Sequence, residues 1–443
     1  MDMNQQQIWD AVRSQAVTSP AIFGQVDFDS IPERFVGEPG QPNELASSGE
    51  EIRNQILAEP ELMSRIRAYT FMGDRVCDPY AALMPEFGFR RLVEMLDTAC
   101  RQGIEAVPEA PAELRALIAA MEARPNWVDI ALVEEGARLE RAGVAIMSPV
   151  AIRAAFIATF VNRYAALPMS ITGALSSESA ARRVKETATF FATSVLPGAL
   201  ERKGDGFRAA AMVRLMHSMV RYNAMRKGRW EVSVYGIPIP QVDQMPAGLM
   251  APTMMATAAL TQGRETFTAE ERARVELARY RCFLLGLPED LLGTTPREIV
   301  TLMAARQATL RPDFDSEICG SLLTATMGAY LPADRSLRSR IFDALERGFT
   351  RVFFVKAYAG GDAARAASMG VVPSFPDKLC FALLGGWTGL RMAFHATARK
   401  LPALRDISDR RLVTQIRGLL EDWGHAHFTT DAAAYGNAPA PKG

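Results

Sequence analysis

The chain has 443 residues, of which 49% are hydrophobic and 23% charged, and its 50 Lys and Arg residues balance its 50 Asp and Glu residues. This length can bury a large core, arranged as one large domain or as two to three smaller ones. The composition is that of an ordinary soluble globular protein. The charge balance argues against a nucleic-acid binder, because such proteins neutralise phosphates with a basic surplus. The basic cluster in residues 221–230 is expected to cap a helix end.

The sequence gives no sign of disulfides, export or membrane insertion. Its five cysteines are far apart, which predicts neither a disulfide framework nor a cysteine-based zinc site. The first residues, MDMNQQQIWD, carry no basic or apolar export signal, and we therefore expect a cytoplasmic protein. Residues 145–175 are the most apolar stretch, but Arg153, Asn162 and Arg163 interrupt it. We expect a buried helix there and no transmembrane segment.

In chain order, the first predicted unit is an N-terminal arm over residues 1–55. It combines short helical possibilities with a run rich in proline, glycine and aspartate over residues 27–49. Residues 56–428 then show helical patterning divided by glycine and proline turns, and we predict one helical domain over this range. Residues 232–242 are the one segment predicted to be extended, so the fold class is all-α. Residues 429–443 are predicted to form a flexible tail.

Common catalytic motifs are missing from the sequence. It contains no Gly-x-Ser-x-Gly, Gly-x-Gly-x-x-Gly, P-loop, His-Glu-x-x-His or Glu-x-x-His motif. The nearest glycine cluster, Gly-Gly-Trp-Thr-Gly at residues 385–389, lacks the strand context of a dinucleotide site. We expect these glycines to allow close helix packing.

Among the four histidines, His217 has the most informative surroundings. It lies in the middle of an apolar stripe with the 3,4,3,4 spacing of one helix face, which also includes Ala210, Val213, Val220 and Ala224. Arg214 and Arg221 lie on the same side of that helix. A neutral imidazole ligates haem iron, and arginine pairs with carboxylates such as haem propionates. On spacing alone, however, a lone histidine on an apolar face is more often an ordinary core residue.

The preceding helical segment, residues 178–191, carries Arg183 and Thr187 one turn apart, with Phe190 on the same face. A loop at residues 197–206 reverses the chain. At a rise of about 1.5 Å per residue, Thr187 and His217 are then expected at similar heights on two antiparallel helices. A flat cofactor between them would meet an imidazole on one side and a hydroxyl and guanidinium on the other, which suits polarisation of bound dioxygen. Taken alone, the pattern is also consistent with Arg183 and Thr187 being ordinary polar residues at the protein surface.

The run Arg183-x-x-x-Thr187, followed thirty residues later by His217-Ser-Met-Val-Arg221, resembles the signature of the latex clearing proteins and of the wider oxygenase family that shares their catalytic domain. Flanking segments are also similar to that family: Met72-Gly73-Asp74 with Asp78, PNWVD at 125–129, TGAL at 172–175 and GIP at 236–238. The resemblance spans roughly residues 60–400 and is strongest over 125–240.

The resemblance implies a helical fold with a globin-like core and a haem b cofactor. By residue matching, it implies that His217 ligates the iron and that Arg183 and Thr187 occupy the distal side. We assign Arg214 or Arg221 to a haem propionate. The sequence has no Cys-x-x-Cys-His motif, which agrees with non-covalent haem. The resemblance further implies dioxygen and a hydrophobic, unsaturated small molecule, of isoprenoid or lipid kind, as the reaction partners.

Two positions depart from the rubber-cleaving members of that family. Glu186 stands where they carry a lysine that can bind iron, and Leu167 stands where they carry a catalytic glutamate. With the missing export signal, these differences disfavour polyisoprene as the substrate. Two other hypotheses therefore stay open: a haem-binding sensor, carrier or peroxidase-like protein without oxygenase turnover, and a helical scaffold that binds no haem. A homo-oligomer is compatible with each of them.

Overall fold

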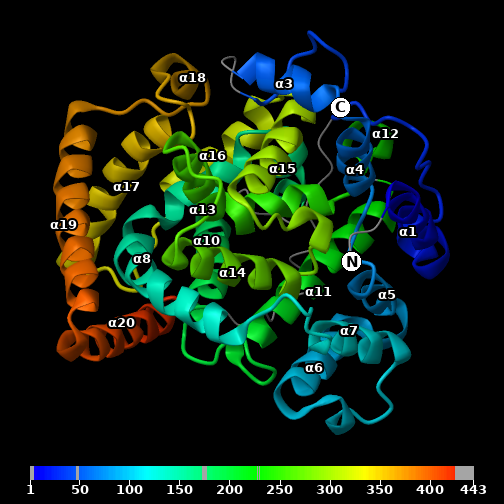
Figure 1. The fold of residues 1–443 in the computed structure, drawn as a ribbon, viewed down its shortest axis with the longest axis horizontal. Coiled ribbons are helices and arrows are strands. Elements are labelled where there is room, and N and C mark those ends of the chain that lie inside the picture. The colour runs from blue at the N-terminus through cyan, green and yellow to red at the C-terminus, as the bar shows by residue number, and fades with distance from the viewer. Residues whose placement is uncertain (1–3, 46–48, 172–176, 227, 229, 425–443) are drawn as a thin grey trace.

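The computed structural model describes residues 4–45, 49–171, 177–226, 228 and 230–424. Within this part of the chain the regular elements are helices, and the β-structure consists of an isolated bridge between Phe35 and Leu310 (Figure 1). The predicted all-α fold class is therefore confirmed. The tail predicted over 429–443, His425, His427 and the segment 172–175 lie outside the described residues.

The first part of the chain contains the helices α1 (Gln5–Thr18), α2 (Pro20–Phe23), α3 (Glu50–Leu57), α4 (Pro60–Thr70), α5 (Cys77–Ala82), α6 (Met84–Gln102), η2 (Ile104–Ala106), α7 (Ala112–Glu122), α8 (Ile130–Ile157), η3 (Ala158–Phe160), α9 (Arg163–Ile171), α10 (Ser177–Thr193) and α11 (Asp205–Arg226). The rest contains α12 (Val232–Tyr235), α13 (Gln241–Thr261), α14 (Ala269–Leu284), η4 (Glu289–Leu291), α15 (Pro296–Thr309), η5 (Ser316–Gly320), α16 (Ser321–Gly328), α17 (Leu337–Ala357), α18 (Ala363–Ser368), α19 (Phe375–Lys400) and α20 (Pro402–Asp422).

Helix α8 is the centre of one half of the protein. Asp129 caps its start, where the side chain accepts hydrogen bonds from the backbone N–H groups of Ala131 and Leu132. The helix packs against α10, α14, α16, α17, α19 and α20. Residues 130–160 are long and apolar enough to cross a membrane, and half of their most apolar window is buried in the protein. Packing among these helices accounts for the apolar residues of the buried half.

Arg153, which interrupts the apolar stretch in the sequence, is fully buried and connects α8 to α17. Its Nε donates to Glu346 Oε2 at 2.8 Å, and its Nη2 donates to Asp343 Oδ1 at 3.2 Å. Its Nη1 donates to the carbonyl oxygens of Thr326 and Ala329 at 2.6 and 2.7 Å. With a longer bond of 3.3 Å to the carbonyl of Met327, two carboxylates and three carbonyls satisfy the guanidinium, which explains how a charge is tolerated there.

The N-terminal residues pack more deeply than an arm laid over the surface. Ile8 and Val12, four residues apart on α1, are buried together with Phe23 of α2. They belong to the same core cluster as Tyr69 and Tyr222. Residues 24–45 contain no helix, as expected for the segment rich in proline and glycine. The difference arises because the short helix α1 is amphipathic and its apolar face needs a partner.

The prediction of an extended segment over 232–242 is wrong at both ends. Val232–Tyr235 forms a helical turn, and α13 begins at Gln241. Between them the chain runs beside the end of α4, where the N–H groups of Ile237 and Gln241 donate to the carbonyls of Thr70 and Met72 at 3.4 and 2.9 Å. Two such bonds do not make a sheet. The apolar residues of Val232–Tyr235, whose alternation suggested a strand, form a helical turn instead.

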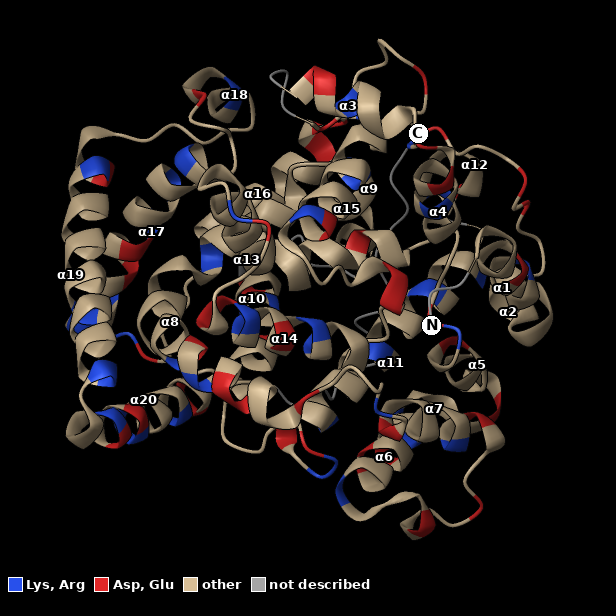
Figure 2. Cartoon of the chain, viewed as in Figure 1, with Lys and Arg blue, Asp and Glu red and all other residues tan. Residues whose placement is uncertain are grey.

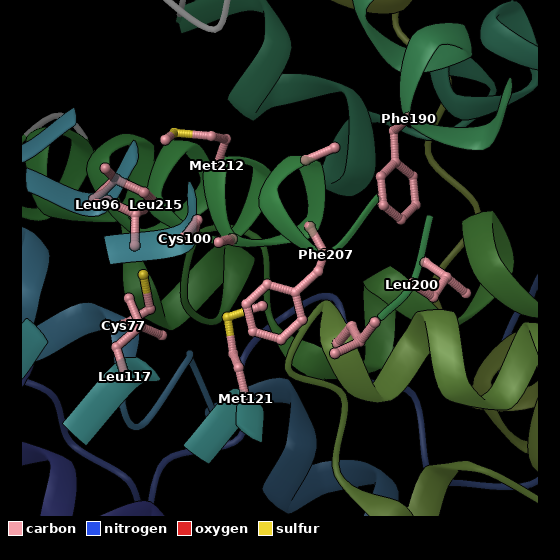
Figure 3. Packing of buried hydrophobic residues seen from close by; sticks show 14 of the residues in the cluster. Cys77, Leu96, Cys100, Leu117, Met121, Phe190, Leu200, Phe207, Met212 and Leu215 are labelled. Atoms are coloured by element: carbon pink, nitrogen blue, oxygen red, sulfur yellow. The ribbon is translucent and has the colours of Figure 1, made fainter. Parts of the chain in front are cut away.

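The junction between α10 and α11 is anchored in the main core cluster. Phe190 of α10 and Leu200 of the connecting loop lie near Phe207 of α11, and Met212 and Leu215 continue the cluster along α11 (Figure 3). Besides α10, α11 packs against α2, α5, α6, α9 and α14. This packing fixes the helix that carries His217.

Candidate functional site

His217 lies on α11, deep in the protein. Most of this helix is buried, but His217, Val213 and Met216 keep partly accessible side chains on one face. Burial lowers the pKa of His217 to about 4, and the positive charge of Arg221 acts in the same direction. The imidazole is therefore neutral at physiological pH and has a lone pair to offer a metal. An accessible apolar strip with a neutral imidazole on it suits a flat apolar ligand.

A chain of amide side chains sets the orientation of this imidazole. The chain starts at the carbonyl of Gly73, which accepts a hydrogen bond from Gln241 Nε2 at 2.9 Å. Gln241 Oε1 then accepts from Gln244 Nε2 at 3.0 Å, so Gln244 Oε1 is turned toward His217 Nδ1, 3.1 Å away. Because a backbone carbonyl only accepts, each donor along the chain is determined. Nδ1–H donates to Gln244, which leaves Nε2 as the unprotonated nitrogen.

Two buried ion pairs flank His217 along α11. Arg214 forms a bidentate pair with Asp74, with Nε–Oδ2 and Nη2–Oδ1 distances of 2.7 Å each. Arg221 Nη1 lies 3.2 Å from Asp78 Oδ1. Both arginines lie within about one helical turn of the histidine. Arg214 is held by Asp74, in the segment between α4 and α5, and Arg221 is held by Asp78 in the first turn of α5. Their role as propionate partners stays a prediction.

The close approach of this segment to α11 requires a glycine. A Cβ added at Gly73 would lie 2.3 Å from Asp78 Oδ2 and 2.8 Å from Arg221 Nε. Burial raises the pKa of Asp78 to about 6 against the attraction of Arg221. Burial acts on Asp74 in the same way, but Arg214, the N–H of Cys77 and Arg221 together hold the pKa of that carboxyl below its usual value. With two contacts of 2.7 Å against one of 3.2 Å, the Arg214 pair is also the more closely held of the two.

Arg221 also holds the turn that begins α13. Its Nη2 donates to the carbonyl of Ile239 at 3.0 Å. Ile239 has a φ of +50°, which a β-branched residue rarely adopts because of steric strain. Pro240 follows as the N-cap residue of α13, and Gln244 lies in the first turns of that helix. Arg221 therefore ties this strained turn to α11 and places Gln244 opposite His217.

Arg183 and Thr187 lie on α10, which contacts α11. Arg183 is partly buried, and its Nη1 lies 3.3 Å from Glu186 Oε2. Thr187 has an exposed side chain. Leu167 is buried in an apolar cluster that includes Trp230, so it offers no acid or base. The role of Arg183 and Thr187 toward dioxygen stays a prediction.

Two cavities of the described chain lie away from His217. One of about 600 Å³ is lined by Tyr330, Ala344, Asp343, Arg335, Arg340, Arg347 and Arg351. A smaller one lies beside His395, whose Nδ1 is 2.7 Å from Ser408 Oγ. Among the described residues, no group of three or more His, Cys, Asp or Glu side chains could hold a metal ion. An iron-containing cofactor held by one protein ligand needs no such group.

Comparison with known protein families shows to which family this chain is related. The family model for the catalytic domain of the ER-bound oxygenases mpaB/B' and the rubber oxygenases matches residues 144–405, more than half of the chain. The chain belongs to this oxygenase family. The matched range includes α10, α11 and the start of α13, and therefore His217, Gln244, Arg183 and Thr187. The predicted family resemblance is confirmed.

A solved structure supports the same conclusion for the fold. The structure of latex clearing protein LCP in the closed state is similar with a TM-score of 0.54 and 18% sequence identity, covering 80% of this chain and 91% of that one. This likeness extends the shared helical fold beyond the range matched by the mpaB and rubber oxygenase family model. A comparison with curated proteins found no match.

Proposed function

We propose that the protein is a b-type haem-dependent oxygenase that acts with dioxygen on an apolar, unsaturated small molecule of isoprenoid or lipid kind. One observation carries the proposal: the neutral imidazole of His217, with Nδ1 held by Gln244 and Nε2 left to bind a metal, in a chain of an oxygenase family. Haem bound there would supply an iron that binds and activates dioxygen.

The protein's own residues supply binding and orientation in this proposal. His217 ligates through Nε2, and the amide chain from Gly73 fixes the tautomer and the plane of the ring. Val213 and Met216 offer apolar surface to the macrocycle. The Thr187 hydroxyl and the Arg183 guanidinium are the groups of this chain that would donate hydrogen bonds to dioxygen.

We expect the haem-loaded protein, incubated with unsaturated lipids and terpenes under ¹⁸O₂, to form carbonyl products that carry the label, as measured by mass spectrometry. Thr187→Val keeps the shape of the side chain but removes the hydroxyl, and should slow product formation on the order of 100-fold. Thr414→Val, an exposed position on α20, is the matched control and should leave the rate unchanged. Equal rates for both variants would contradict the assignment of Thr187.

A haem protein without turnover is the second candidate. Leu167 favours it, because this buried apolar residue occupies the position at which rubber-cleaving members carry a glutamate. The same assay separates the two candidates. Reversible dioxygen binding without labelled products across the substrate panel would favour the sensor or carrier and count against the oxygenase.

Gln244→Leu tests the amide chain that orients the imidazole. The substitution removes the acceptor of the Nδ1–H bond while keeping a similar volume, and we expect haem affinity to fall at least about 10-fold. The measurement is a haem titration of the haem-free protein followed by visible absorbance. Gln262→Leu, an exposed position at the end of α13, is the control. An unchanged affinity for Gln244→Leu would mean that Gln244 does not position the ligand.

A further inference from the structure

Helix α19 presents an uncharged apolar face to solvent at the outer edge of the molecule, beside α17 (Figure 1). Its large side chains are between 46% and 81% exposed, and they are Phe375, Leu379, Leu383, Trp387, Leu390 and Phe394. Between Lys378 and Lys400, no exposed residue of the helix is charged, and most of the helix is tan in Figure 2. The two charges along this length, Arg391 and Arg399, are partly buried. Arg391 stacks on Trp387, and Arg399 pairs with Glu270 of α14.

The size of this face exceeds what a monomer usually leaves exposed. At roughly 200 Å² for a large side chain, the exposed fractions of these six residues amount to about 700 Å². The largest apolar patch of a typical monomer covers roughly 300–600 Å², whereas a standard protein interface buries about 800 Å² on each partner. The face is therefore large enough to form a stable interface.

The face consists of a ridge and a groove that run side by side. The ridge has helical spacing and is formed by Leu383, Trp387, Leu390 and Phe394. The groove beside it has the same spacing and small side chains, and is formed by Ala382, Gly386, Gly389 and Ala393. A Cβ added at Gly386 or Gly389 would meet nothing within 4 Å, so packing within the described chain does not require these glycines. A ridge beside a groove is self-complementary, as a two-fold interface between identical chains requires.

The glycines favour a helix over a lipid surface as the partner. Glycine in the interior of an exposed helix is destabilising by about 1 kcal/mol relative to alanine, and it adds little apolar area for contact with lipid. Close approach of a second helix backbone gives a reason for glycine at 385, 386 and 389. The residues of this chain after 424, HAHFTTDAAAYGNAPAPKG, contain too few large apolar side chains to cover the face.

The charges are compatible with a second copy. Lys378 and Lys400 lie at the two ends of the helix. Two helices that pack with their ridges in each other's grooves cross at roughly −50°, so their ends diverge and these like charges stay apart. We propose that α19 is the interface of a two-fold symmetric dimer of this chain, in which the ridge of each copy lies in the groove of the other.

The test is the mass of the full-length protein in solution, measured by sedimentation velocity over a wide concentration range. We expect wild type at twice the chain mass, and we expect Leu390→Glu and Gly389→Leu each to raise the dissociation constant on the order of 30-fold or more. Gly389→Leu introduces a better helix former, so loss of the fold does not explain its effect. Met254→Glu, exposed on α13, is the matched control and should remain dimeric.

Three outcomes would overturn the proposal. The first is a wild-type chain that stays monomeric at the highest concentration. The second is a dimer that neither α19 variant weakens, which would place the interface elsewhere. The third is a monomer that sediments with phosphatidylcholine and phosphatidylglycerol vesicles and loses this property in Leu390→Glu, which would make lipid the partner. None of these readouts depends on haem, so they do not bear on the proposed oxygenase activity.

Discussion

His217→Ala is expected to give a folded protein that takes up no haem and has no oxygenase turnover. The imidazole is the proposed iron ligand, and the ion pairs of Arg214 and Arg221 on either side of it do not need the ring. The measurement is the absorption spectrum after haem titration, together with the product assay. His395→Ala is the matched control, because His395 is also buried and hydrogen-bonded but lies on α19. A Soret band in His217→Ala equal to that of wild type would end the proposal for this site.

The same histidine should make the stability of the haem-free protein depend on pH. Burial lowers the pKa of His217 from 6.5 to about 4. As the pH falls, the imidazole is therefore protonated near pH 6.5 in the unfolded chain but only near pH 4 in the folded chain. The stabilisation is fully present above pH 6.5 and is lost as the pH falls toward 4, by up to about 3 kcal/mol. Urea unfolding at several pH values in this window should show a smaller loss for His217→Ala than for wild type.

Local spacing predicted the helix of His217 well, because burial of an apolar face imposes the 3,4 pattern directly on the sequence. The same spacing puts Arg214 and Arg221 one turn before and one turn after the histidine, and both are buried. It gave no indication of their partners, since Asp74 and Asp78 lie 140 and 143 residues away along the chain. Pairing at that separation depends on how the α4–α5 segment crosses α11, which no local pattern encodes.

Gln244 was missed for a related reason. A glutamine near the start of a helix is usually a surface residue, and no motif marks this one. Its contact with His217 depends on the positive φ of Ile239, on the bond from Arg221 that holds that turn, and on the hydrogen bond that Gln241 makes to Gly73. The MGD and GIP segments that resemble the family are the sequence signals nearest to this arrangement, since both lie within it.

Asp74→Asn is expected to destabilise the protein by about 3–5 kcal/mol, because it leaves the buried guanidinium of Arg214 without a counter-charge. Asparagine keeps the size of the side chain and the oxygen that accepts the N–H of Cys77, so the loss reports the charge pair. Urea unfolding of the haem-free protein near neutral pH measures it. Asp29→Ala, which breaks the exposed pair with Arg13, is the matched control and should change stability by about 1 kcal/mol or less.

The double variant Asp74→Asn/Arg214→Met separates the lost charge pair from other damage. Methionine fills much of the space of the arginine stem without a charge, so the double variant should recover at least about 1 kcal/mol of what Asp74→Asn loses. If the double variant is less stable than Asp74→Asn, the arginine stabilises α11 mainly through packing rather than through its bond to Asp74. Haem affinity should follow the same order as stability, because this pair fixes the helix one turn before His217.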